Sequence, residues 1–141
     1  MANLVKRVVD RIGRVVHRYP LSLVIILAIV YLSLFKVAND NLPKIENLDK
    51  VAHFCMYAGL CSILWFEYFK THKQTSLLKM IMGAVVAPIL FSGAMEVAQV
   101  ALTDNRSADW YDFLFNTLGV VAAIFIGLYV IRPVILKKRR Q

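Results

Sequence analysis

Charged residues are scarce in this chain, and long stretches lack them altogether. Only 18% of the 141 residues are charged, whereas 59% are hydrophobic. A soluble domain usually has about 25% charged and about 45–50% apolar residues. The charged residues cluster between apolar stretches of about 20 residues, the length that a bilayer requires. The composition therefore argues against a soluble domain and predicts an integral membrane protein of one domain.

Cysteine is also scarce, and sequence repeats and low-complexity linkers are absent. Cys55 and Cys61 stand six residues apart in one apolar segment, without the spacing of a Cys-x-x-Cys or Cys/His zinc site. We interpret both as small core residues. No cleavage site of small residues follows the first apolar stretch, so a cleaved signal peptide is not expected.

Acidic residues are outnumbered, nine against 17 basic ones, which gives a net charge of +8. In a soluble protein this excess would suggest nucleic acid. Here the basic residues lie beside apolar spans, so we expect no nucleic-acid partner. Thirteen of them fall in the N-terminal segment, in residues 70–79 and in residues 132–141. The positive-inside rule then predicts that both termini are cytoplasmic, with residues 39–48 and 103–108 outside.

Hydrophobic periodicity predicts an all-α polytopic membrane protein. Residues 1–19 alternate apolar and basic positions at helical spacing, which predicts an amphipathic helix at the membrane surface. Residues 20–132 are expected to form a compact bundle of four transmembrane helices, followed by a basic cytoplasmic tail, 133–141. The four spans are predicted at about 21–38, 49–69, 77–102 and 109–131.

Proline and small residues predict local features of these spans. We expect a bend at Pro88, which cannot donate to the helix ladder. Small residues at packing spacing are expected to allow close helix approach. They are Gly83 with Ala87, and Gly119 with Ala123 and Gly127.

Polar side chains recur on one face of three predicted spans and reach similar depths in the outer half of the membrane. Arg106 lies in the loop before the last of these faces. The three faces carry Asp49, His53 and Tyr57; Ser92, Glu96 and Gln99; and Asp109, Asp112 and Asn116. Ionisable groups at such depth cost a few kcal/mol and normally face a protein interior.

Two interpretations of these faces are open. A hydrogen-bond network that holds the helices together is favoured for Tyr57, Ser92, Gln99 and Asn116 taken singly. A site is favoured for His53, Glu96 and Asp112 together with Arg106, because helix packing does not need an imidazole, carboxylates and a guanidinium at one place.

The chemistry of this set suits an anionic head group. Arg106 can grip a phosphate with two parallel donors. His53 can act as acid, base or nucleophile, oriented by Asp49 or Asp112, while Glu96 carries protons. A divalent metal on His53, Glu96 and Asp112 is an alternative, but no standard spacing such as H-E-x-x-H supports it. We therefore assign no metal and leave any cofactor unknown.

The same residues carry a family resemblance. The segment Asp49–Tyr57 resembles the D-K-x-x-H-x-x-x-Y motif of VanZ-like proteins. Glu96 and Gln99 match that family's E-x-x-Q, and Arg106–Gly119 is similar to its R-x-x-D-x-x-D-x-x-x-N-x-x-G. The resemblance covers roughly residues 45–130 and leaves the amphipathic N-terminal helix outside it.

The resemblance implies a location in the bacterial inner (plasma) membrane and a function on lipids. The family's namesake is linked to low-level teicoplanin resistance, which we do not expect of this chain. The family has been proposed to belong with membrane enzymes that act on lipid head groups, phosphatidylserine synthases among them. His53, Glu96 and Asp112 would then be catalytic. The substrate-binding residues would be Asp49, Tyr57, Gln99, Arg106, Asp109 and Asn116.

Our leading hypothesis is a membrane protein whose outward-facing polar pocket binds, and in an enzyme version modifies, an anionic head group. The expected partners are membrane lipids or a lipid-linked cell-wall precursor, and a homo-oligomer is left open. The alternative is a non-catalytic module that shields a precursor or stabilises a partner protein. A small transporter subunit is a third hypothesis, which no broken-helix repeat supports. The enzyme version requires His53, Glu96, Arg106 and Asp112 around one cavity.

Overall fold

The structure is a computed structural model that describes residues 1–34, 48–72, 74–102 and 109–141. Within these ranges it contains helices and no strand, which confirms the all-α class. The end of the first predicted span, residues 39–47 and the loop with Arg106 lie outside the described residues. The helices are α1 (Ala2–Arg18), α2 (Pro20–Leu34), α3 (Leu48–Thr71), α4 (Leu77–Ile81), α5 (Ala87–Leu102), α6 (Trp110–Ile126) and α7 (Arg132–Lys138), with π-helical turns η1 (Met82–Val86) and η2 (Gly127–Ile131).

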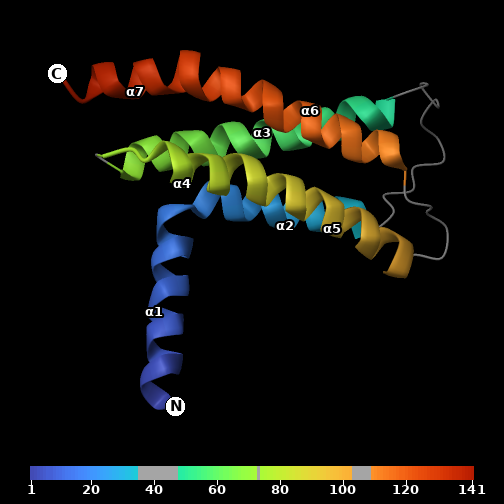
Figure 1. Cartoon of the computed structure of the whole chain (residues 1–141), viewed down its shortest axis with the longest axis horizontal. Helices are drawn as coiled ribbons and strands as arrows, with labels where there is room; N and C mark the ends of the chain where they lie inside the picture. The colour runs from blue at the N-terminus through green and yellow to red at the C-terminus, as the bar shows by residue number, and fades with distance from the viewer. Residues whose placement is uncertain (35–47, 73, 103–108) are drawn as a thin grey trace.

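Four long helical segments lie side by side, and α1 leaves them at 93° to α2 (Figure 1). The segments are α2, α3, the rod α4–η1–α5 and the rod α6–η2–α7. The starts of α3 and α6 lie at one end with the last turns of α2 and α5, at the right of Figure 1. We call this the site end. The α1–α2 elbow and the C-terminus lie at the opposite end.

Two of these segments, Leu77–Leu102 and Trp110–Lys138, are long and apolar enough to cross a membrane. The bent pair α1–α2 is a third candidate if it is counted as one span. The last span extends seven residues beyond its predicted end, so most of the predicted tail is helical. Membrane-spanning helices are therefore present, and a total of four spans is taken up below as a proposal.

Polar and apolar side chains are distributed inside out compared with a soluble protein. Large apolar side chains such as Leu90, Val97 and Phe125 are 68%, 69% and 59% exposed. Water would penalise such a surface, whereas hydrocarbon would not. The buried polar residues are Ser22, Ser33, His53, Glu67, Ser92, Glu96, Gln99, Asp112 and Asn116.

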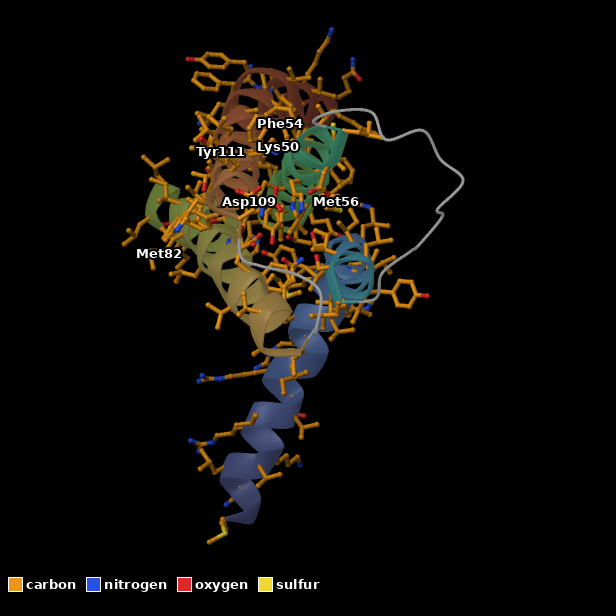
Figure 2. The ribbon with its side chains drawn as sticks, turned by 90° about the vertical axis from the view of Figure 1, so that its right-hand side faces the viewer. Lys50, Phe54, Met56, Met82, Asp109 and Tyr111 are labelled. Atoms are coloured by element: carbon orange, nitrogen blue, oxygen red, sulfur yellow. The ribbon has the colours of Figure 1, made fainter. Side chains whose placement is uncertain are left out.

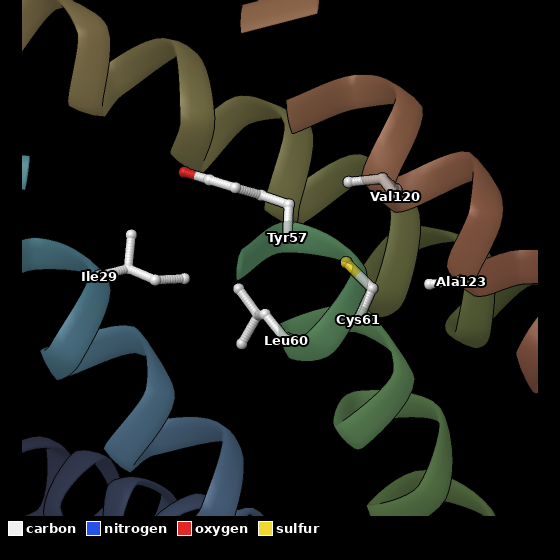
Figure 3. Packing of buried hydrophobic residues seen from close by; sticks show 6 residues of the cluster. All are labelled: Ile29, Tyr57, Leu60, Cys61, Val120 and Ala123. Carbon is white, nitrogen blue, oxygen red and sulfur yellow. The ribbon is translucent and has the colours of Figure 1, made fainter. Parts of the chain in front are cut away.

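The apolar core lies where α2, α3 and α6 meet (Figure 3). Its buried members are Ile29, Tyr57, Leu60, Cys61, Val120 and Ala123. Cys61 is fully buried, which confirms its prediction as a core residue, whereas Cys55 is exposed and that prediction is wrong. The two thiols differ because a separation of six residues turns them about 120° apart around the helix.

Glycine allows α3 and α6 to approach closely. A Cβ on Gly119 would overlap the backbone oxygen of Phe54 and lie 2.9 Å from the backbone nitrogen of Ala58. A Cβ on Gly127 would overlap the ring of Trp65. The predicted packing role is thus confirmed at Gly119 and Gly127, and the intervening Ala123 is fully buried.

The same role is wrong for Gly83 and Ala87. Both residues are exposed, and a Cβ on Gly83 would meet no atom within 4 Å. Gly83 lines an open cavity beside α1, α2 and α3 and packs against none of them. Small-residue spacing alone does not say which side of a helix meets a partner.

Both long rods carry a π-helical turn that ends two residues before a proline. Turn η1 precedes Pro88 and η2 precedes Pro133. Proline has no N–H, and its ring crowds the carbonyl four residues earlier. A π-helical turn shifts the hydrogen-bond partner by one residue and so accommodates the proline. The distortion expected at Pro88 is therefore found one turn ahead of it.

Two charged side chains cap helix ends away from the site end. The Glu67 carboxylate accepts hydrogen bonds from the backbone of Leu21 (2.9 Å) and Ser22 (3.2 Å), and from the Ser22 hydroxyl (2.6 Å). It thereby satisfies free N–H groups at the start of α2. The Arg139 guanidinium donates to backbone carbonyls of Phe69, Lys70 and His72 at the end of α3.

Candidate functional site

The predicted polar faces of α3, α5 and α6 converge at the site end. Figure 2 looks toward this end and shows oxygen and nitrogen atoms gathered between the helices, close to the labelled Lys50 and Asp109. Asp109 caps α6, because its side chain accepts a hydrogen bond of 2.8 Å from the backbone of Tyr111. This cap starts the helix that carries Asp112 and Asn116.

His53 lies at the centre of this network. Its Nδ1 is 3.1 Å from Oδ1 of Asn116, and the amide nitrogen of Asn116 donates to Ser92 Oγ at 2.8 Å. On the other side of the ring, Nε2 lies 3.5 Å from Oδ2 of Asp112 and 3.8 Å from Oδ1 of Asp49. All of these residues except Asp49 are buried, so α3, α5 and α6 share one interior polar network.

Two further polar residues lie next to the network. Tyr57 is buried beside Ser92 and Glu96, and Glu96 is only 8% exposed. Gln99 is also buried, and its amide nitrogen donates to the backbone oxygen of Ser33 at 3.2 Å. Gln99 therefore ties α5 to α2, and its predicted substrate-binding role stays a prediction.

Lys50 lies at the site end, but its sequence position did not lead us to predict it as a candidate site residue. Its Nζ lies 4.0 Å from Oδ2 of Asp109 and 5.8 Å from the centre of the Tyr111 ring (Figure 2). Its position next to Asp49 in the first motif was the available indication. Arg106 lies outside the described residues, so its predicted grip on phosphate stays a prediction.

A groove of about 550 Å³ lies between α5 and α6 at this end. Val97 and Trp110 on its walls are 69% and 82% exposed, so the groove is accessible from the side. Its lining consists of two acidic residues and otherwise apolar residues or glycine. These are Gly93, Glu96, Val97, Val100, Ala101, Asp109, Trp110 and Phe113.

The groove is lined by one of the catalytic candidates. Glu96 lines it, whereas His53 and Asp112 are not among its lining residues. The expectation of one cavity shared with Arg106 stays a prediction, because Arg106 lies outside the described residues. Asp112 and Asn116 belong to the face of α6 that packs on α3, and Phe113 is turned by about 100° toward α5. The polar network and the groove are therefore adjacent, with Glu96 and Asp109 at their boundary.

The comparison with protein families extends this picture. A family model described as VanZ/LLP1 matches residues 5–132. The chain belongs to the VanZ/LLP1 family. The match contains every candidate site residue and also most of α1, so the expectation that the amphipathic helix lies outside the family was wrong. Neither the comparison with curated proteins nor that with solved structures finds a significant match.

Proposed function

We propose that this VanZ/LLP1 protein crosses a bacterial inner membrane four times, with α2 and α3 as the additional spans. The polar residues of α3 support this, because His53, Tyr57 and Glu67 are buried while Val51 and Phe66 are exposed. The angle of 93° between α1 and α2 supports this, because the amphipathic α1 would lie along the membrane surface if α2 spans it. The basic end of α7 lies at the same end as the α1–α2 elbow. That end would be cytoplasmic and the site end external.

Single-cysteine labelling tests this topology. Both native cysteines are first removed by Cys55→Ser and Cys61→Ala. Two variants then each receive one cysteine at an exposed position, Leu48→Cys at the site end and Gln74→Cys at the opposite end. A membrane-impermeant maleimide applied to intact bacterial cells is expected to label the first variant, and the second only after permeabilisation. Equal labelling of both variants in intact cells would contradict the orientation.

We propose further that the site end binds the anionic head group of a membrane lipid or lipid-linked cell-envelope precursor. The groove between α5 and α6 supports this proposal, because its lining is apolar except for the two acidic side chains of Glu96 and Asp109. An acyl chain would lie against Val97 and Val100, and the head group would reach Lys50 beside Asp109. Such a mostly apolar cleft with a few convergent polar groups is the usual form of a ligand site.

Lipid retention in nanodiscs tests this function. The protein is placed in nanodiscs that contain equal amounts of phosphatidylglycerol and phosphatidylcholine. Native mass spectrometry is expected to show that it retains the anionic phosphatidylglycerol. The change Ala101→Trp fills the groove and should reduce that retention at least tenfold. Val121→Trp adds the same ring at a position of α6 that is 41% exposed and outside the groove, and should retain lipid like the wild type. Equal retention of both lipids by the wild type would contradict the proposal.

The masses of cellular lipids separate the enzyme version from the non-catalytic one. In the enzyme version His53, Glu96 and Asp112 move protons while the head group is chemically modified. Lipids from cells with the wild-type protein would then differ in mass from those of cells with His53→Ala or Glu96→Gln. Identical lipid profiles with unchanged retention would leave a module that binds or shields a precursor.

A further inference from the structure

We infer that Asp49, His53 and Asp112 form a binding site for one divalent cation of the Zn²⁺ or Mn²⁺ class. One ligand atom from each residue lies within 4.8 Å of the other two. The cation would supply the positive charge with which an acidic site holds an anionic head group. That role rests on the proposed function, whereas the binding of the cation does not.

The distances suit a shared cation. Nε2 of His53 lies 3.5 Å from the nearer Asp112 oxygen and 3.8 Å from the nearer Asp49 oxygen. Ligands at about 2.0–2.2 Å from a tetrahedral zinc ion are roughly 3.4 Å apart. The two distances from His53 are within a few tenths of an ångström of that value, and the two carboxylates lie within 4.8 Å of each other. Rotation of the exposed Asp49 side chain would complete the coordination.

The orientation of His53 independently points to a positive charge at this place. The amide nitrogen of Asn116 donates to Ser92, so its oxygen faces Nδ1 of His53 and can accept the hydrogen of that nitrogen. Nε2 then faces two carboxylates, and a positive charge between them, either a bound cation or a second proton on the ring, stabilises this arrangement. Histidines that bind metals usually donate their other N–H to such an oxygen acceptor.

Asp112 provides a second observation. The residue is only 9% exposed, and its Oδ1 is buried without a hydrogen-bond partner among the described residues. A buried carboxylate oxygen without a partner is costly. Because Oδ2 is the oxygen that faces His53, a carboxylate that coordinates the cation through both oxygens would remove that cost. The Asp49 side chain is 64% exposed, so it leaves a route from the surface to the buried pair.

The donor set indicates the class of cation. Imidazole suits zinc and other transition metals, whereas carboxylates suit magnesium, calcium and manganese. One imidazole with two carboxylates therefore favours Zn²⁺ or Mn²⁺ over Mg²⁺ or Ca²⁺. Three protein ligands leave a coordination position open, as in catalytic zinc sites. A phosphate oxygen of the head group would take that position.

Metal titration of the full chain tests the inference. The protein, in phosphatidylcholine nanodiscs and with Cys55→Ser to remove an exposed thiol, is stripped with a chelator and titrated calorimetrically with ZnCl₂ and MnCl₂. We expect one equivalent to bind. Asp49→Asn, at an exposed position, and Asp112→Asn should each weaken binding at least tenfold. Asn116→Leu should weaken it by about 10–100-fold, because it removes the acceptor of the His53 N–H. Asp10→Asn on α1 is the matched control and should bind like the wild type.

Two results would overturn the site. One is the absence of saturable binding, and the other is binding that Asp49→Asn and Asp112→Asn leave unchanged in folded protein. His53 would then carry a second proton between the carboxylates in place of a metal. Repeating the lipid assay with EDTA separates this outcome from failure of the proposed function. If the protein retains anionic lipid but binds no metal, only the cation site is contradicted. If it binds metal but shows no preference for anionic lipid, only the proposed function is contradicted.

Discussion

Gly119→Ala is expected to lower the free energy of unfolding by about 3 kcal/mol, at the upper end of the cost of overpacking a core. The added methyl group would overlap backbone atoms of Phe54 and Ala58, which cannot rotate away as a side chain can. Relief requires α3 and α6 to move apart. Because Phe54 follows His53 and Asn116 lies one turn before Gly119, the bond between His53 and Asn116 should lengthen as well.

The measurement is unfolding in mixed micelles, followed by tryptophan fluorescence, with Gly59→Ala as the control. Gly59 lies on α3, where a Cβ would meet no atom within 4 Å. That change should leave stability unaltered or raise it by up to about 1 kcal/mol, since alanine favours a helix over glycine. A Gly119→Ala protein as stable as the Gly59→Ala protein would mean that the two helices are not in close contact.

Glu67→Ala is expected to cost about 3–5 kcal/mol and to loosen the α1–α2 elbow. The carboxylate accepts three hydrogen bonds, two of them from the backbone of Leu21 and Ser22. A hydrogen bond to a charged group contributes about 1.5–3 kcal/mol. The three bonds share one carboxylate and are not additive, so the expected total is below their sum. The first turn of α2 would lose its cap while α3 kept its apolar contacts.

Two milder variants calibrate this effect in the same unfolding assay. Glu67→Gln keeps an acceptor oxygen at the same reach and should recover part of the loss. Ser22→Ala removes only the hydroxyl donor and should cost about 1 kcal/mol. If Glu67→Ala unfolds at the same denaturant concentration as the wild type, Glu67 does not cap α2.

Much of the helical framework was predictable because it depends on local pattern. The predicted limits of the second span, 49–69, differ from α3 by one residue at its start and two at its end, and the third coincides with Leu77–Leu102. The polar faces were also predictable, since ionisable groups in a span turn inward. The errors came where a pattern fits either side of a helix, as at Gly83 and Cys55.

By itself, the sequence determined the all-α membrane class, the inward side of α3, α5 and α6 and the membership in the family. Each follows from hydrophobicity, helical period or motif spacing, which are properties of one segment at a time. Only the tertiary structure decided that Nε2 of His53 meets Asp49 and Asp112, and that Glu96 lines the groove between α5 and α6. It likewise assigned Glu67 to the start of α2. Distances between helices depend on how each is rotated and shifted along its neighbours, and local spacing does not encode those two quantities.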